Sequence, residues 1–235
     1  MKTKDIELET SNINLIELEQ LKRSLYTGKI KIENFIKRTF DIVGSIFGIF
    51  ALIPLSIGIY IANLIVGDRG PLFYSQKRIG KNGKLFKMYK YRSMVVGADE
   101  KLEKYLQENE EAREEFKKYK KLKADPRITR IGNFIRKTSL DEFPQFINVL
   151  KGDMSLVGPR PYLPSEKEEM SVFYKYITSC RPGVTGFWQI NGRSNVTFSD
   201  RLDMDMKYFK QRSLRNDFRI LKITIKKVLV RDGAI

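Results

Sequence analysis

The chain has 235 residues, with 44 Lys or Arg against 28 Asp or Glu, so its formal net charge is +16 at pH 7. It contains no histidine, which excludes imidazole-based hydrolysis, His-based phosphotransfer and H-E-x-x-H zinc sites. The charge favours anionic partners such as phospholipid headgroups or nucleotides, and without a zinc-ligand or basic-zipper pattern we expect no nucleic-acid partner. The single cysteine, Cys180, favours a small buried hydrophobic role over a catalytic one.

Residues 1–36 form a leader that mixes Leu and Ile with charges, either a helix lying on the protein or bilayer or an unstructured lead-in. An uncharged run then extends from Ile42 to Val66, about 25 residues, which is long enough to cross a hydrocarbon core as a helix. Pro54 lies at its middle, and basic residues flank both ends. Because positive charge marks the cytoplasmic side, we predict that residues 37–67 form a membrane-embedded re-entrant helix hairpin bent at Pro54.

Residues 68–235 are expected to form a cytoplasmic catalytic domain of α+β, mainly helical, class. Aromatic and basic residues between Leu72 and Arg92, around Gly80-Lys81-Asn82-Gly83, predict a small β-hairpin. Residues 99–123 are almost all helix formers and predict a solvated amphipathic helix or helix pair. The stretch from Phe218 to Val230 predicts a basic amphipathic helix, either interfacial at an anionic membrane or packed on the core.

The adjacent carboxylates Asp141 and Glu142 lie in a basic segment and allow two interpretations. One is structural, since Ser139-x-x-Glu142 matches a helix capping box. The other is chemical, since such carboxylates can hold Mg²⁺ against a phosphate or attack phosphorus. An ordinary Asp has a pKa of about 3.9, so it is ionised at neutral pH and needs no separate base to act as a nucleophile.

Basic residues near this pair are candidates for neutralising phosphate oxygens. They are Arg136, Lys137 and Arg160, and Pro159 and Pro161 fix the backbone on either side of Arg160. The alternative for each is a solvated surface charge. A second acidic group, Asp200, Asp203 and Asp205, lacks the glycine of a calcium loop and is expected to be a solvated helix face.

In these residues the chain resembles the bacterial sugar transferases, the monotopic phosphoglycosyl transferases, from about Lys37 to Val230. The matching segments are Lys37–Asp41, Gly70–Gly80, Lys90–Met94, Arg136–Gln145, Gly152–Pro161 and Arg181–Gly186. The chain departs from the family in one place. Family members commonly have Ser directly before the kinking proline, whereas here Ile53 precedes Pro54 and Ser56 follows it.

The resemblance implies transfer of a sugar 1-phosphate from a UDP-sugar to undecaprenyl phosphate, with release of UMP and a requirement for Mg²⁺. Asp141 would be the nucleophile that forms a covalent phosphosugar intermediate, and Glu142 would assist through the metal or a proton. The implied substrate-binding residues are Arg136, Lys137, Arg160, Lys90 and Arg92.

The same resemblance places the protein at the cytoplasmic face of the bacterial inner membrane, embedded in the lipid bilayer, and leaves a homo-oligomer open. The stretch from Arg181 to Ser194 is most similar to enzymes that start capsule, exopolysaccharide or O-antigen chains with galactose or glucose. The alternative function is a non-enzymatic protein that binds the membrane surface through its basic face.

Overall fold

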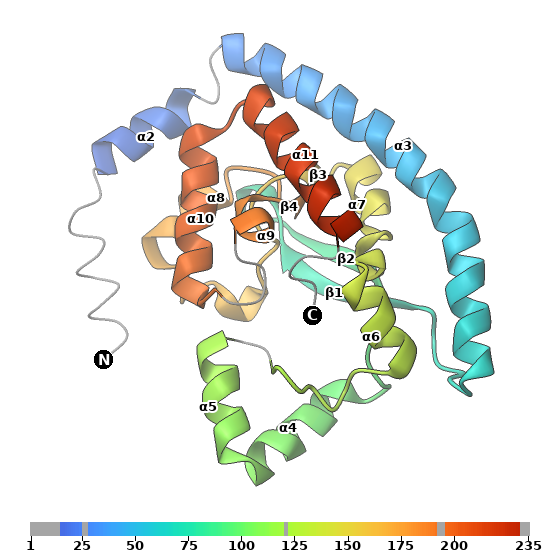
Figure 1. The fold of residues 1–235 in the computed structure, drawn as a ribbon. Helices are drawn as coiled ribbons and strands as arrows, with labels where there is room; N and C mark the ends of the chain where they lie inside the picture. The colour runs from blue at the N-terminus through green and yellow to red at the C-terminus, as the bar shows by residue number, and fades with distance from the viewer. Residues whose placement is uncertain (1–14, 25–27, 120–121, 192–195, 231–235) are drawn as a thin grey trace.

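The structure is a computed structural model that describes residues 15–24, 28–119, 122–191 and 196–230. Its architecture is α+β and mainly helical, as predicted (Figure 1). In the described residues the strands form two small two-stranded sheets, and helices surround them. The first fourteen residues of the leader and residues 192–194 of the stretch matched for sugar choice lie outside the described residues.

The described part of the leader packs on the protein. Helix α2 (Leu15–Ser24) inserts Leu18, which is 1 % exposed, into the main hydrophobic core. The Tyr176 hydroxyl donates a hydrogen bond to Glu19 at 3.1 Å, and Lys175 forms an ion pair with the same carboxylate. Of the two alternatives for this segment, a helix lying on the protein therefore holds for residues 15–24.

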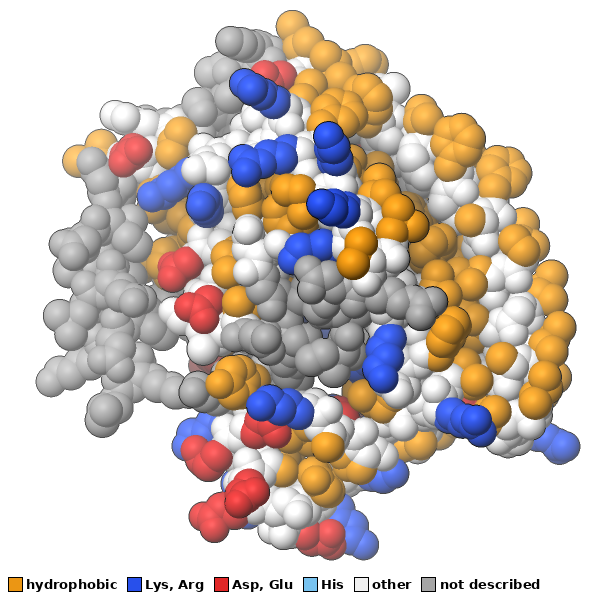
Figure 2. Space-filling view, in the orientation of Figure 1, with side chains coloured by type: hydrophobic (Ala, Val, Ile, Leu, Met, Phe, Trp, Pro, Cys, Tyr) orange, Lys and Arg blue, Asp and Glu red, His pale blue; other side chains and the backbone are white. Residues whose placement is uncertain are grey.

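The apolar run belongs to α3 (Gly28–Ile65), a single helix that contains Pro54 and curves around the rest of the protein (Figure 1). The structure does not divide this segment into two helices at the proline. Residues 31–65 are long and apolar enough to cross a membrane. Large apolar side chains recur every three or four residues on the exposed face and line the right-hand edge in Figure 2. Examples are Phe40, Val43, Phe47, Phe50, Ile53, Ile57, Ile61 and Leu64.

The predicted hairpin is confirmed by β1 (Phe73–Ile79) and β2 (Leu85–Tyr91), which pair antiparallel from Phe73↔Tyr91 to Ile79↔Leu85. The turn η1 (Lys81–Gly83) places Asn82 and Gly83 at φ angles of 56° and 79°. Asn and Gly are the residues that tolerate such left-handed backbone, which explains how this sequence closes the hairpin.

A second, parallel pair joins β3 (Ser155–Val157) to β4 (Gly183–Thr185). Here the glycines allow two loops to pack backbone against backbone. A Cβ atom on Gly183 would lie 2.1 Å from the Gly158 nitrogen, and one on Gly186 would lie 2.2 Å from the Gly158 oxygen. Both are closer than real Cβ contacts allow, so a side chain at either glycine would push β4 away from the loop that carries Arg160.

The remaining elements complete the body. They are α4 (Ala98–Glu108), α5 (Glu110–Tyr119), α6 (Arg130–Lys137), η2 (Leu140–Glu142), α7 (Gln145–Lys151), η3 (Pro164–Glu166), η4 (Ser171–Phe173), α8 (Tyr174–Ile177), α9 (Phe187–Asn191), α10 (Phe198–Gln211) and α11 (Leu214–Val230). Helices α4 and α5 are the predicted helix pair. Cys180 is 3 % exposed within the main core, which confirms its expected buried role.

Helix α11 packs on the core, which is one of the two roles predicted for the C-terminal stretch, and its interfacial role stays a prediction. Ile220 is fully buried in the core, whereas Phe218, Ile225 and Leu229 are exposed. The Phe218 ring meets Phe40 of α3 edge to face, with 5.0 Å between ring centroids. The exposed apolar face of α3 therefore continues onto α11.

Candidate active site

The Asp141–Glu142 pair lies in the three-residue turn η2, between α6 and α7. The predicted capping box is wrong, because Ser139 makes no capping hydrogen bond through its side chain. Ser139 instead adopts a left-handed conformation with a φ of 58°, and the chain turns sharply there after α6. Pro144 has no N–H and a fixed φ, and α7 starts only after it, at Gln145.

Both carboxylates converge on one cation from the β-hairpin. The Lys90 ammonium donates a hydrogen bond to Glu142 Oε1 at 2.8 Å and lies 3.7 Å from Asp141 Oδ2. The Asp141 side chain is 13 % exposed, less than half the exposure of Glu142. The turn thus directs both carboxylates towards Lys90, and Asp141 is the less exposed of the two.

Burial raises the pKa of Asp141, and the neighbouring Glu142 charge raises it further, while Lys90 and Arg136 act in the opposite direction. A carboxylate with a raised pKa is poorly solvated in its ionised form. Additional positive charge near Asp141 therefore stabilises its ionised form. Arg136 lies close enough to lower the pKa of Asp141 in this way.

The other predicted site residues are placed differently. Lys137 is exposed at the end of α6. Arg92 is 8 % exposed and joins the turn after α3 to the end of β2, since its guanidinium donates to Asp68 Oδ1 at 2.8 Å and to the Pro71 carbonyl at 2.6 Å. The structure therefore brings Lys90 to the carboxylates, whereas Arg92 joins the turn after α3 to β2.

The loop that carries Arg160 is held by Asp205 of α10. Asp205 Oδ2 accepts hydrogen bonds from the Arg160 backbone N–H at 3.0 Å and from the Tyr162 hydroxyl at 2.8 Å. Asp205 is fully buried, and burial raises its pKa to about 7. Our prediction that this residue belongs to a solvated helix face is therefore wrong.

The sequence does contain a pattern that predicts the burial of Asp205. Leu202, Asp205, Met206 and Phe209 follow the i, i+3, i+4, i+7 pattern of one helix face, which puts Asp205 on the apolar face of α10. Asp200 instead caps the helix, since its carboxylate accepts from the Thr197 backbone N–H at 2.9 Å.

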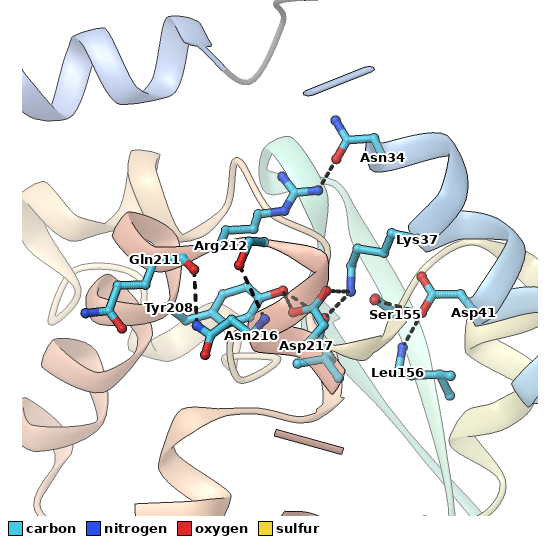
Figure 3. Close-up of polar contacts among 12 residues, drawn as sticks. Asn34, Lys37, Asp41, Ser155, Leu156, Tyr208, Gln211, Arg212, Asn216 and Asp217 are labelled. Atoms are coloured by element: carbon cyan, nitrogen blue, oxygen red, sulfur yellow. Dashed lines mark hydrogen bonds and ion pairs between the residues drawn. The ribbon is translucent and has the colours of Figure 1, made fainter. Parts of the chain in front are cut away.

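The segment Lys37–Asp41 docks α3 on the body (Figure 3). Lys37 donates to the Val157 carbonyl at 2.9 Å and forms an ion pair with Asp217 of α11 at 2.7 Å. Asp41 accepts from the Ser155 hydroxyl at 3.0 Å and from the Leu156 N–H at 2.9 Å.

Two further contacts strengthen this docking. Arg38 donates to the Val149 and Leu150 carbonyls at the end of α7, at 2.6 and 2.9 Å. The buried Tyr208 hydroxyl donates to Asp217 Oδ1 at 2.9 Å. The sequence analysis singled out neither Asp217 nor Tyr208, because their partners Lys37 and Val157 lie far away in the chain.

The second half of α3 is also attached to the body, near the proline. The Tyr91 hydroxyl lies 2.6 Å from Ser56 Oγ and donates to the Leu52 carbonyl at 3.2 Å. The serine that follows Pro54 therefore joins this part of the helix to strand β2. Leu52 and Ile59 form a hydrophobic cluster with Tyr91 and Ile135, so contacts to the body extend along both halves of α3.

Comparison with known proteins gives a consistent result. The model of the family described as bacterial sugar transferase matches residues 32–231. The chain is 50 % identical over 200 residues to the undecaprenyl-phosphate galactose phosphotransferase of Salmonella typhimurium, covering 85 % of this chain and 42 % of that protein. It is 39 % identical over 209 residues to the exopolysaccharide production protein ExoY of Sinorhizobium fredii, covering 88 % of this chain and 92 % of that protein.

A third relative is the UDP-glucose:undecaprenyl-phosphate glucose-1-phosphate transferase of Escherichia coli, 34 % identical over 211 residues, with 86 % of this chain and 42 % of that protein covered. The chain therefore spans about two fifths of the length of the Salmonella and Escherichia proteins and nearly all of the Sinorhizobium protein. With a family match over most of its length and identities of this size, the chain belongs to the bacterial sugar transferase family.

Proposed function

We propose that the protein transfers a sugar 1-phosphate from UDP-galactose or UDP-glucose to undecaprenyl phosphate at the start of exopolysaccharide, capsule or O-antigen assembly. The observation that carries the proposal is the Asp141–Glu142–Lys90 cluster, in a chain that lacks histidine. The names of the Salmonella and Escherichia relatives support the donor and the lipid acceptor.

The proposed reaction has two displacements at the phosphorus that carries the sugar. In the first, an Asp141 oxygen attacks this phosphorus and its bond to the UMP oxygen breaks, so that UMP leaves with the bonding electrons. In the second, a phosphate oxygen of undecaprenyl phosphate attacks the same phosphorus and the bond to Asp141 breaks. The products are UMP and undecaprenyl diphosphate sugar, and the Asp141 carboxylate is regenerated.

The cations around Asp141 have a clear task in this reaction. Phosphoryl transfer is accelerated mainly by positioning and by neutralising charge on phosphate oxygens. Lys90 and Arg136 stabilise the negative charge of the Asp141 carboxylate. When this carboxylate forms the acyl phosphate, both cations can interact with a phosphate oxygen instead. Arg136 is the better suited to hold two oxygens at once, because its guanidinium is a planar fork.

Mg²⁺ is part of the proposal. Asp141 and Glu142 are two adjacent carboxylates, and the described residues contain no cluster of three or more metal-ligating side chains. This set fits Mg²⁺, which takes one or two carboxylates and completes its coordination with water and substrate phosphates. The ion would supply charge neutralisation on the diphosphate of the donor.

We further propose that α3 enters and leaves the inner membrane at the cytoplasmic face, with its bend at Pro54. The contacts described above fix both halves of α3 to one body, through Lys37 and Asp41 on one side of Pro54 and through Ser56 on the other. Attachment of both halves to one body supports a placement with both ends of the helix on the same side of the bilayer. Its outward apolar face, together with that of α11, supplies the surface for the lipid.

Cysteine labelling tests this placement. Lys31→Cys and Arg69→Cys put thiols at exposed positions on either side of the membrane segment. We expect an impermeant maleimide to label both variants in inside-out vesicles and neither in intact cells. The native chain is the control, since Cys180 is buried and its burial raises the pKa of the thiol. Labelling of either position in intact cells would refute the proposed topology.

Release of UMP tests the reaction itself. The purified protein, given Mg²⁺ and undecaprenyl phosphate, should release UMP from UDP-galactose or UDP-glucose faster than from UDP-N-acetylglucosamine. Omission of the lipid should stop continuous turnover, because the phosphosugar then stays on Asp141. If no UDP-sugar releases UMP while the protein binds anionic vesicles in a salt-dependent manner, the non-enzymatic alternative holds instead.

A further inference from the structure

A hollow lies between the start of α3 and the turn that joins α10 to α11. The space in it is about 310 Å³, including the part that is open to solvent. Its lining includes Glu33, Asn34 and Lys37 of α3 and Arg212, Ser213 and Asp217 from the α10–α11 turn. Figure 3 shows side chains from both sides reaching across, with Arg212 directed to Asn34 and Lys37 directed to Asp217.

Four of these residues are charged, and two of them neutralise each other. Lys37 and Asp217 form the ion pair at 2.7 Å described above. The other two, Glu33 and Arg212, have opposite charges, yet in the described part of the chain neither belongs to an ion pair within 4.0 Å. Arg212 donates instead to the neutral amide oxygen of Asn34. The hollow therefore holds one cation and one anion that each lack a partner of opposite charge among the described residues.

Two neutral groups add donors next to the guanidinium of Arg212. The Asn34 amide accepts from Arg212 through its oxygen, and its NH₂ group has no acceptor among the residues that the structure describes. The Ser213 hydroxyl accepts from the Asn216 N–H at 3.3 Å, and its own hydrogen likewise has no acceptor there. A guanidinium, an amide NH₂ and a hydroxyl together suit the oxygens of a phosphate. The Glu33 carboxylate suits a cation attached to that phosphate.

The hollow adjoins the exposed apolar faces of α3 and α11. Phe40 follows Lys37 by three residues, so it lies on the same face of α3. Phe218 follows Leu214, which also lines the hollow, by four residues on α11. The two phenylalanine rings contact each other and are 49 and 48 % exposed. The uncharged run begins at Ile42, so in the proposed membrane placement the hollow lies at the level of lipid headgroups, with apolar surface beside it for acyl chains.

The hollow is separate from the candidate active site. Leu140 and Phe143, on either side of the Asp141–Glu142 pair, pack with Leu55 of α3. About five turns, or about 27 Å, of the same helix separate Leu55 from Lys37. A phosphate bound between α3 and the α10–α11 turn is therefore not the phosphate that reacts at Asp141.

We propose that this hollow binds the headgroup of a phospholipid with a primary ammonium group, as in phosphatidylethanolamine, with its phosphate at Arg212 and its ammonium at Glu33. This zwitterion supplies both missing partners, whereas an anionic headgroup leaves Glu33 uncompensated. A quaternary ammonium has no N–H to donate to a carboxylate and is typically bound by aromatic cages, and no lining residue is aromatic. The inference goes beyond the proposed reaction and uses only the proposed placement of α3.

Lipid-dependent thermal unfolding tests the site without turnover. The full chain, purified in detergent and depleted of lipid, is unfolded with and without phosphatidylethanolamine in mixed micelles. At a lipid concentration about 100 times the Kd, the Tm should rise by about 5–10 °C, because a ligand that binds only the folded chain stabilises it. Phosphatidylcholine should give a smaller rise. Free phosphoethanolamine, which has no acyl chains, should give none at the same concentration.

Two variants identify the residues that recognise the headgroup. Glu33→Gln should remove the preference for phosphatidylethanolamine over phosphatidylcholine. Arg212→Gln should at least halve the Tm rise with both lipids, because loss of a charged hydrogen bond weakens binding about tenfold or more. Glu103→Gln on α4 and Arg215→Gln on α11 remove the same charges at exposed positions and should respond like the wild-type chain. Each Tm rise is measured against the same variant without lipid, so a change in basal stability does not affect it.

Several results would overturn the proposal. They are equal Tm rises with phosphatidylethanolamine and phosphatidylcholine in the wild-type chain, a larger rise with phosphatidylglycerol, and no rise with any lipid. A loss in Arg215→Gln as large as in Arg212→Gln would assign the effect to general surface charge. Removal of the effect by undecaprenyl phosphate would assign the hollow to the acceptor lipid. None of these measurements depends on release of UMP, so failure of this site is distinguishable from failure of the proposed function.

Discussion

Replacement of Asp141 by Asn is expected to abolish turnover while leaving the fold intact. The amide is a poor nucleophile and cannot form the acyl phosphate, and removal of a covalent nucleophile costs up to about 10⁶-fold in kcat in a well-studied hydrolase. We expect UMP release by Asp141→Asn to fall at least about 10⁴-fold. Single-turnover incubation with a radiolabelled UDP-sugar should also leave no label on the variant.

The same variant should not be less stable than the wild-type chain. Because burial raises the pKa of Asp141, the folded protein disfavours the ionised carboxylate at neutral pH. A neutral side chain of the same shape removes this penalty, so the Tm should be unchanged or up to about 4 °C higher. Asp99→Asn, at an exposed position on α4, is the matched control and should change neither UMP release nor Tm. Undiminished UMP release by Asp141→Asn would eliminate the proposed nucleophile.

The raised pKa of Asp141 also predicts how kcat/KM depends on pH. Asp141 must be ionised to attack, so kcat/KM should fall with decreasing pH as this carboxyl group takes up a proton. The acid limb should lie above the pH of about 3.9 at which an ordinary Asp titrates, because burial raises the pKa of this one. An acid limb at or below that value in a buffer-matched profile would contradict the poorly solvated environment seen here.

Local patterns in the sequence predict much of this fold. The β-hairpin follows from alternating residues around Asn82-Gly83, and the helix pair follows from the spacing of apolar residues in 99–123. The apolar run lies in one long helix with an exposed apolar face, and the hairpin predicted at Pro54 is not confirmed. Each of these signals lies within one element or one turn, where propensity and periodicity determine the outcome.

The site itself depends on contacts between residues far apart in the chain. Lys90 and Glu142 are 52 residues apart, and no local pattern shows that Lys90 reaches the carboxylates whereas Arg92 turns to Asp68. The same limit applies to Asp205. Its buried position follows from the face of α10 on which it lies, but its partners in the Arg160 loop follow only from tertiary packing.

The wrong capping box at Ser139 has a different cause. The pattern S-x-x-E is a true signal for helix starts, yet Pro144 follows too soon for a helix to begin at Ser139. The result is a short turn that directs both carboxylates towards Lys90. A conflict between two local signals, each valid alone, thus occurs at the turn of the candidate site.

Replacement of Lys37 by Met, in the hydrogen-bond network of Figure 3, is expected to lower the stability of the protein strongly. Lys37 and Asp217 are 14 % and 8 % exposed in their side chains, so their ion pair is largely buried. Loss of one partner leaves an uncompensated charge, which typically costs about 3–5 kcal/mol. For a chain of this size, the Tm should fall by about 6–20 °C, measured by thermal unfolding in detergent. Lys31→Met, at an exposed position of the same helix, is the control and should stay within about 0.5 kcal/mol of wild type.

A double variant separates the charge from the packing. In Lys37→Met with Asp217→Asn, the amide oxygen still accepts from Tyr208 and the buried charge is gone, so most of the lost stability should return. Burial already raises the pKa of Asp217, and Lys37 lowers it, so removal of Lys37 raises it further. The folded single variant then binds a proton more tightly than the unfolded chain, and its deficit should shrink as the pH falls towards the pKa of the buried carboxyl.

The outcome bears on how α3 and the candidate site are coupled. Lys37 donates to the Val157 carbonyl, three residues before Arg160, and Tyr208 donates to the same carbonyl. One network therefore holds α3, α10, α11 and the start of the Arg160 loop together. If Lys37→Met unfolds within about 2 °C of the wild-type chain, this ion pair does not hold α3 on the body, and the first half of the helix depends on the hydrogen bonds of Arg38 and Asp41 alone.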